Sequence, residues 1–271
     1  MSDTEQQGVD DAFTFPLCRL QWNGPKLHGH CTTRQKTLHF RSYVPEWGRP
    51  MDLQEELDAF RAEFIRNAPP GRVELYDAKV NELRSHFPIQ AALKVGDRAP
   101  DFALPDVFGL PVSLAQRLAE GPTVVTFYRG GWCPYCNIQL RWYQQSLPEI
   151  AGLGGKIIAI SPQLPDGSLA MAEANKLEFD VLSDVGNGVA RSFGLVYALA
   201  DELRAALQSN DKALPRINGD DSWELPVPAT YLIASDRRIA LAAVPVDYRQ
   251  RLAPEAIIAA LKALRTTSDA A

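Results

Sequence analysis

The chain has 271 residues, of which 46% are hydrophobic and 23% are charged, and its formal net charge at pH 7 is −5. This composition is typical of a globular protein of one or two domains, and the negative charge gives no electrostatic case for nucleic acid or an anionic membrane as partner. No apolar run approaches the roughly 18 residues of a membrane-spanning helix, and the acidic N-terminus is not followed by the apolar segment of a secretory signal. Four cysteines are too few for a disulfide scaffold of this length, so we expect a cytoplasmic protein without membrane association.

Residues 1–50 have no hydrophobic period, because glycine and proline interrupt the segment repeatedly. We expect a poorly ordered extension there. A strong helix start follows directly, which makes Met51 a candidate for the true initiator.

Residues 51–90 predict a helical hairpin. Leu53, Leu57, Phe60 and Phe64 recur at helical spacing over residues 52–67, and a second helical pattern follows the Pro69-Pro70-Gly71 break over residues 72–87. The hairpin either packs onto the next domain or forms the surface of a homodimer, and the pattern leaves both readings open.

Residues 91–266 alternate between strand and helix patterns and predict one α/β domain. Predicted strands are 101–104, 123–128, 156–161, 229–234 and 239–244; predicted helices are 134–147, 168–176, 187–193, 201–208 and 254–264. The runs at 123–128 and 156–160 are almost continuously apolar, as in strands buried on both faces. The last two strands, joined by residues 235–238, predict an antiparallel hairpin. This order indicates a thioredoxin-like fold, a central mixed sheet flanked by helices.

Cys133 and Cys136 lie three residues apart, where the buried strand at 123–128 gives way to a helix. Residues at this spacing share one face of a helix's first turn, so their sulfurs can form a disulfide. The free N–H groups and the positive dipole end of a helix stabilise a thiolate, which lowers a cysteine pKa from about 8.5 toward roughly 3.5–7.5. The motif therefore predicts a redox-active dithiol.

Several motifs resemble the alkyl hydroperoxide reductase/thiol-specific antioxidant family, the peroxiredoxins, in the branch that carries a C-x-x-C. They are residues 99–105 (APDFALP), 127–136 (FYRGGWCPYC), 160–163 (ISPQ), 182–184 (LSD), 189–194 (VARSFG) and 228–233 (PATYLI). The resemblance covers about residues 90–265. It implies a thioredoxin fold, a hydroperoxide substrate and a thioredoxin- or glutaredoxin-type reductant, with no cofactor.

The active-site details depart from that family. Without gaps, the peroxiredoxin pattern P-x-x-x-T-x-x-C places Cys136 at the peroxidatic cysteine but Cys133 at its threonine, and Pro228 stands where an activating arginine is usual. The thioredoxin pattern W-C-x-x-C instead makes Cys133 the attacking thiolate, and there Pro228 corresponds to a cis-proline beside the disulfide. The order of attack stays open at this point.

Three further residues are candidates. Arg129 either favours a nearby thiolate and binds a peroxide oxygen, or is an exposed or carboxylate-paired arginine at a strand end. Trp132 and Tyr135 can form a substrate or partner surface or cover the start of the helix, and the two roles are compatible. The alternative for Cys133 and Cys136 is that they form half of a structural zinc site. The sequence contains neither a second C-x-x-C nor an H-x-x-x-H that could supply the other two ligands, so we expect no metal.

We therefore predict a thiol-dependent peroxidase that works through a Cys133/Cys136 dithiol–disulfide cycle. The alternative is a thiol–disulfide oxidoreductase acting on protein or small-molecule disulfides, and a redox-responsive binding module is a third reading.

Overall fold

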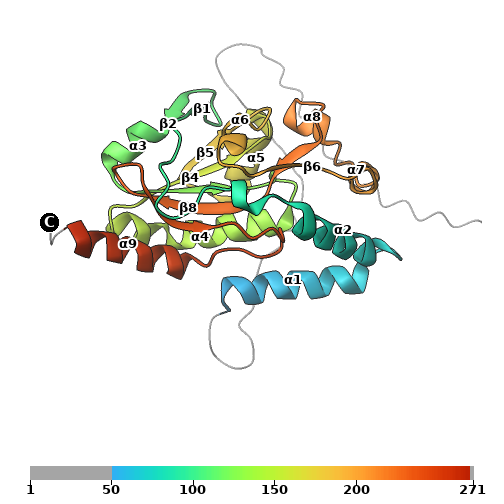
Figure 1. Cartoon of the computed structure of the whole chain (residues 1–271). Coiled ribbons are helices and arrows are strands. Elements are labelled where there is room, and N and C mark those ends of the chain that lie inside the picture. Colours follow the sequence, from blue (N-terminus) through green and yellow to red (C-terminus); the bar gives the residue numbers. More distant parts are fainter. Residues whose placement is uncertain (1–50, 269–271) are drawn as a thin grey trace, which may run out of the picture. The chain divides into compact units, whose positions relative to one another are not determined.

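A computed structural model describes residues 51–268 of the chain (Figure 1). Its central sheet has the strand order β5–β4–β3–β8–β9. The strands are β3 (Thr123–Phe127), β4 (Lys156–Ser161), β5 (Asp180–Ser183), β8 (Ala229–Ile233) and β9 (Ile239–Ala243). β3, β4 and β5 are parallel, whereas β8 is antiparallel to both β3 and β9. The prediction of an α/β fold with a central mixed sheet, closed by an antiparallel hairpin, is confirmed.

Strand β3 is buried on both faces. Val125 and Phe127 pack in a hydrophobic cluster with side chains of α3 (Leu114–Glu120) and α6 (Gly188–Ser192). Val124 points to the opposite face and packs with α4 (Pro134–Gly152) and α9 (Pro254–Ser268), which lie along that side of the sheet in Figure 1. Because successive strand residues point to opposite faces, a strand between two helical layers needs a continuous apolar run.

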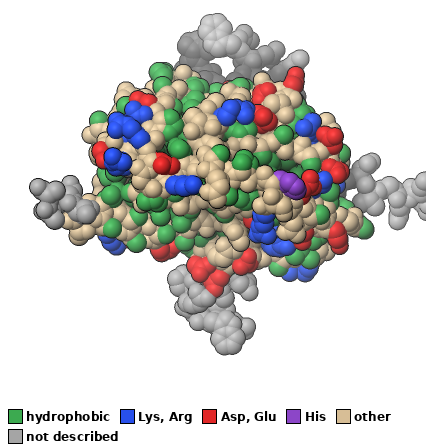
Figure 2. All heavy atoms as spheres, viewed as in Figure 1, with side chains coloured by type: hydrophobic (Ala, Val, Ile, Leu, Met, Phe, Trp, Pro, Cys, Tyr) green, Lys and Arg blue, Asp and Glu red, His purple; other side chains and the backbone are tan. Residues whose placement is uncertain are grey.

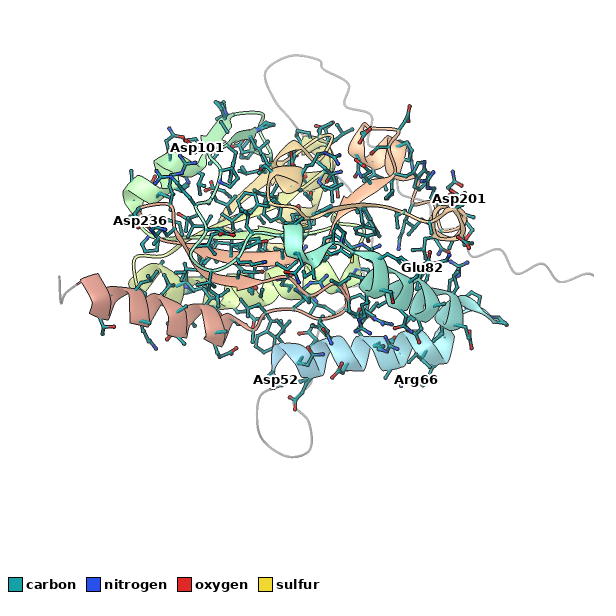
Figure 3. The ribbon with its side chains drawn as sticks, in the orientation of Figure 1. Asp52, Arg66, Glu82, Asp101, Asp201 and Asp236 are labelled. Carbon is teal, nitrogen blue, oxygen red and sulfur yellow. The ribbon has the colours of Figure 1, made fainter. Side chains whose placement is uncertain are left out.

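Two helices precede the sheet, α1 (Leu53–Asn67) and α2 (Arg72–His86), and we call them with their connection the N-terminal hairpin. Helix α1 begins with a capping box, because the Asp52 carboxylate accepts the Glu55 N–H at 2.8 Å and Glu55 accepts the Asp52 N–H at 3.0 Å. Figure 3 labels Asp52 and Arg66 near the two ends of this helix.

Helix α1 packs against α4. Leu53 and Leu57 are buried in the cluster that also contains both active-site cysteines. Glu56 adds a polar contact, since it accepts the indole N–H of Trp142 at 2.6 Å and pairs with Arg141 at 3.1 Å. The division of the chain at residues 50 and 90 stays a prediction, and the expected extension at 1–50 lies outside the described residues.

The structure differs from the predicted elements chiefly in short segments. The opening strand lies at Ala103–Pro105 (β1) rather than 101–104 and pairs with the unpredicted β2 (Pro111–Ser113), outside the main sheet. Helix α4 continues through Pro148 to Gly152 instead of ending at 147. The remaining elements are η1 (Ile89–Ala91), α5 (Pro165–Asn175), β6 (Val196–Ala198), α7 (Asp201–Gln208), α8 (Leu214–Asn218) and β7 (Glu224–Pro226).

On the face shown in Figure 2, acidic and basic side chains are interspersed rather than gathered into one field. Within residues 51–268, no helix is both long and apolar enough to cross a bilayer.

Candidate active site

The two cysteines lie at the start of α4, directly after the turn that leaves β3. Cys133 is the N-cap residue of α4 and Pro134 is its first residue, where a proline costs no hydrogen bond. Cys136 lies in the first turn, with its N–H donating to the Cys133 carbonyl at 3.0 Å. Both thiols are free and almost fully buried, at 2% and 0% exposure. The structure thus brings the predicted pair together at a helix N-terminus.

The turn before Cys133 is fixed by its glycines. Gly130 has φ +136°, which favours glycine, and an added Cβ would lie 2.5 Å from the indole nitrogen of Trp132. The Gly131 N–H donates to Gln163 Oε1 at 2.7 Å, and the Gly131 carbonyl accepts from Asn137 Nδ2 at 2.8 Å. These contacts hold the turn to both α4 and the loop after β4.

The pKa values of the two thiols are shifted in opposite directions. A hydrogen bond from Cys136 is the main influence that lowers the pKa of Cys133 to about 5; burial opposes it, and the charges of Arg129 and Arg251 support it. Burial, joined by the hydrogen bond to Cys133, raises the pKa of Cys136 well above its ordinary value. The geometry therefore favours Cys133 as the thiolate, as the thioredoxin register predicts.

Arg129 is a buried cation between two aromatic rings. Its side chain is 6% exposed, and its guanidinium carbon lies 4.9 Å from the Trp132 ring centroid and 4.1 Å from that of Tyr248. No carboxylate forms an ion pair with it among residues 51–268, and its Nε has no hydrogen-bond partner there. A buried charge is costly unless it is compensated, and the Cys133 thiolate is the anion that the site offers. The reading of Arg129 as exposed or carboxylate-paired does not fit this environment.

Sequence reasoning missed the loop after β9. Arg251 Nη2 lies 3.5 Å from the Cys136 sulfur, and Tyr248 stacks on Arg129. The only sequence signal was the density of charged and aromatic residues over 247–251, directly after the last strand. The second guanidinium at the dithiol therefore comes from this loop and not from position 228.

An ion-pair network holds that loop against the N-terminal hairpin. Asp247 is 5% exposed and accepts hydrogen bonds from Arg84 of α2 at 2.8 Å and from Arg249 Nε at 2.8 Å. Arg249 also pairs with Asp77 of α2, which in turn pairs with Arg61 of α1 at 3.0 Å. The loop that carries Tyr248 and Arg251 is thus tied to both helices of the hairpin.

The structure places the two predicted aromatic residues differently. Trp132 is half-buried and packs toward a cluster that includes Trp223. Tyr135 is 7% exposed, because its ring meets Phe60 at 5.0 Å and Tyr248 at 5.7 Å between centroids. Tyr135 therefore belongs mainly to the packing of α1 on the active-site helix, although both residues line the cavity described next.

A cavity of about 460 Å³ opens onto the dithiol. Its wall includes Arg129, Trp132, Cys133 and Tyr135, whereas Cys136 is not part of it. Other parts of the wall come from α1, α2 and α7, largely through apolar side chains. The lower-pKa sulfur is thus the one that faces the cavity.

Pro228 lies directly before β8 and is buried. Continuing the β3–β8 register past Phe127↔Ala229 places it opposite Tyr128, on the path to Arg129 and the dithiol. A role for Pro228 beside a disulfide stays a prediction. Among residues 51–268, no group of three or more His, Cys, Asp or Glu could hold a metal ion.

Residues 95–242 match a family model described as the AhpC/TSA family. A Mycobacterium tuberculosis protein named "Putative peroxiredoxin" is 26% identical over 175 residues, which cover 64% of this chain and 99% of the relative. Peroxiredoxin Bcp of Escherichia coli K12 is 33% identical over 103 residues, 38% of this chain and 65% of the relative. The crystal structure of peroxidoxin BcpB from M. tuberculosis superposes with a TM-score of 0.51 at 24% identity, covering 63% of this chain and 97% of that chain, which shows a shared fold.

Proposed function

The chain belongs to the AhpC/TSA family, and from this premise we propose that it is a thiol-dependent peroxidase with a thioredoxin fold. The observation that carries the proposal is the pairing of an acidic, cavity-facing Cys133 with a buried Arg129 that has no carboxylate partner in the described part of the chain. A thiolate is a strong nucleophile, and a guanidinium beside it can hydrogen-bond the peroxide oxygens.

In the first step, the Cys133 thiolate attacks the distal oxygen of a hydroperoxide ROOH. The S–O bond forms while the O–O bond breaks, which gives a sulfenic acid on Cys133 and an alkoxide that takes up a proton to leave as ROH. Arg129 stabilises the thiolate before attack and the negative charge on the leaving oxygen afterwards.

In the second step, the Cys136 sulfur attacks the sulfenic sulfur of Cys133. The disulfide forms and water leaves. Arg251, 3.5 Å from Cys136, favours the ionised form of this otherwise weakly acidic thiol. A dithiol donor of the thioredoxin or glutaredoxin type then reduces the disulfide by thiol–disulfide exchange, and no metal or organic cofactor enters the cycle.

The alternative function, thiol–disulfide oxidoreductase, is favoured by one observation, the assignment of the thiolate to Cys133 in a W-C-x-x-C motif. Against it stands the burial of both sulfurs beneath α1 and the loop after β9, since a protein disulfide cannot reach a sulfur that is 2% exposed. This geometry favours hydroperoxides that fit the cavity over protein disulfides as the oxidising substrate. For the same reason, reduction by a protein donor requires the disulfide form to expose its sulfurs more than the dithiol form does.

We also propose that the protein is cytoplasmic and that it forms a homodimer. Sedimentation equilibrium of the full chain tests the dimer.

The experiment that tests the function compares turnover of hydrogen peroxide and cumene hydroperoxide, coupled to a thioredoxin system, with the reduction of insulin disulfides. We expect peroxide turnover well above that of free dithiothreitol, and its loss in Cys133→Ser. Insulin reduction without peroxide turnover would establish the alternative function instead.

A further inference from the structure

The N-terminal hairpin lies outside the residues that match the family model, 95–242, and yet it forms much of the wall of the cavity that Cys133 faces. Phe60 and Phe64 of α1 and Val73, Tyr76 and Val80 of α2 line the cavity. The family domain alone would leave this side of the dithiol open.

Helix α7 also lines the cavity, through Leu203 and Leu207. It is tied to α2 by an ion pair between Lys79 and Glu202 at 2.8 Å and by a hydrogen bond from Arg72 to the Ala206 carbonyl at 3.0 Å. Figure 3 shows Glu82 of α2 and Asp201 of α7 on the same side of the molecule. The parts of the cavity wall that come from α2 and α7 are therefore held together by direct contacts.

Several charged side chains that line the cavity are paired with one another. Asp77 pairs with Arg61 and Arg249, and Lys79 pairs with Glu82 at 3.0 Å and with Glu202. Arg129 and Cys133 have no such ion pair with another side chain of residues 51–268, and they are the charged groups that the site offers to a ligand at the dithiol. The hydroperoxide group of a substrate needs contact only with these two residues.

The rest of the space is suited to an apolar group. Hydrogen peroxide would occupy a small part of about 460 Å³, a volume within the range of sites for drug-sized molecules. We propose that the hairpin and α7 bind the organic group of a bulky apolar hydroperoxide, which this protein reduces in preference to hydrogen peroxide; this inference rests on the proposed peroxidase function.

The test measures kcat/KM for cumene hydroperoxide and for hydrogen peroxide. Burial of a group of several carbons is worth about tenfold or more in kcat/KM, so we expect at least that preference for cumene hydroperoxide in the native protein. Leu203→Asp, which puts a charge in the cavity wall, lowers the ratio of the two kcat/KM values about tenfold. The matched control, Ala205→Asp on the exposed side of α7, leaves the ratio unchanged.

A second pair of variants tests the hairpin itself. Val73→Trp fills part of the cavity and is expected to lower the same ratio, whereas Ala78→Trp on the exposed side of α2 is not. Equal kcat/KM values for the two peroxides in the native protein, or a ratio that neither cavity variant changes, would overturn the inference.

A binding measurement separates this inference from the peroxidase function. Cumyl alcohol, which has no O–O bond, is titrated into the Cys133→Ser protein by calorimetry, with and without Leu203→Asp. Saturable binding that Leu203→Asp weakens supports the site, and absence of binding, or equal binding in both proteins, refutes it. Failure to reduce either peroxide would instead refute the function.

Discussion

At Cys133 several influences act on one sulfur atom. The Cys136 thiol donates a hydrogen bond to it, Arg129 and Arg251 contribute positive charge, and the residue caps the N-terminus of α4. Each of these favours the anion, and together they outweigh the burial that disfavours it. At Cys136, burial and the hydrogen bond donated to Cys133 outweigh the charge of Arg251, so its pKa is raised. This difference supports the proposed roles of Cys133 as nucleophile and Cys136 as resolving group.

Besides the hydrogen bond from Cys136, the charge of Arg129 should therefore help to keep Cys133 ionised at acidic pH. Cys133 is ionised above its pKa of about 5, so its alkylation by iodoacetamide, followed on the Cys133 peptide by mass spectrometry, should fall only as the pH drops through that value. In Arg129→Met we expect the pKa to move toward the ordinary value of about 8.5, and the alkylation rate at pH 6 to drop at least about tenfold.

Arg265→Met, which removes an exposed arginine from α9, is the matched control and should leave the profile unchanged. An unchanged pH profile in a folded Arg129→Met protein would show that Arg129 does not stabilise the thiolate.

Arg251 should act on the second step of the proposed cycle, the attack of Cys136 on the sulfenic acid of Cys133. Because burial raises the pKa of Cys136, its attack on the sulfenic acid depends on the guanidinium 3.5 Å away. In Arg251→Met we expect disulfide formation after a single pulse of peroxide to slow about tenfold, which corresponds to about 1.4 kcal/mol. Stopped-flow fluorescence measures this rate, and the Arg265→Met protein again serves as control. A slower first step with an unchanged second step would assign Arg251 to peroxide attack instead.

At the scale of elements, the loop after β9 is placed by the N-terminal hairpin. Burial alone would raise the pKa of Asp247, but hydrogen bonds from Arg249 and the charges of Arg249 and Arg84 lower it. A carboxylate with a lowered pKa stabilises the fold above the unfolded value of about 3.9 and loses that contribution as the pH falls through its folded value.

Replacing Asp247 should therefore weaken both the fold and the site. For Asp247→Asn we expect the free energy of unfolding at pH 7 to fall by about 1.5–3 kcal/mol, the range for hydrogen bonds to charged groups. The difference from the native protein should shrink near pH 3, which lies below the unfolded value, because the carboxylate of the unfolded chain is then mostly protonated. Urea denaturation at both pH values measures this, with Asp236→Asn, an exposed aspartate, as control. An equal loss at pH 3 and pH 7 would mean that the carboxylate charge is not the cause.

At the scale of the whole molecule, local patterns predicted four strands of the central sheet and the helix that carries the dithiol, but not the edge strand β5. Strand β4 and helix α7 have the predicted bounds, because a continuous apolar run and a helical period of apolar residues are signals within a few residues. Strands β6 and β7, of three residues each, carry no such period and were missed. Cys133, Cys136 and Arg129 were found because they lie within eight positions of one another.

The contacts that assign roles to these residues are not local. Arg251 meets Cys136 across 115 positions, and that meeting depends on how β9, its loop and the hairpin pack. The ungapped peroxiredoxin register placed Cys136 at the attacking position, whereas the fold buries Cys136 away from the cavity and leaves Cys133 facing it. Which sulfur meets the substrate is a property of tertiary structure and could not be read from spacing.

The most direct test of this account is to identify the sulfur that peroxide oxidises first. Cys133→Ser and Cys136→Ser proteins are treated with one equivalent of cumene hydroperoxide in the presence of dimedone, and the labelled peptide is identified by mass spectrometry. We predict that the Cys136→Ser protein carries dimedone on Cys133 and that the Cys133→Ser protein remains unlabelled. Labelling of Cys136 in the Cys133→Ser protein, with none on Cys133 in the other, would contradict the account.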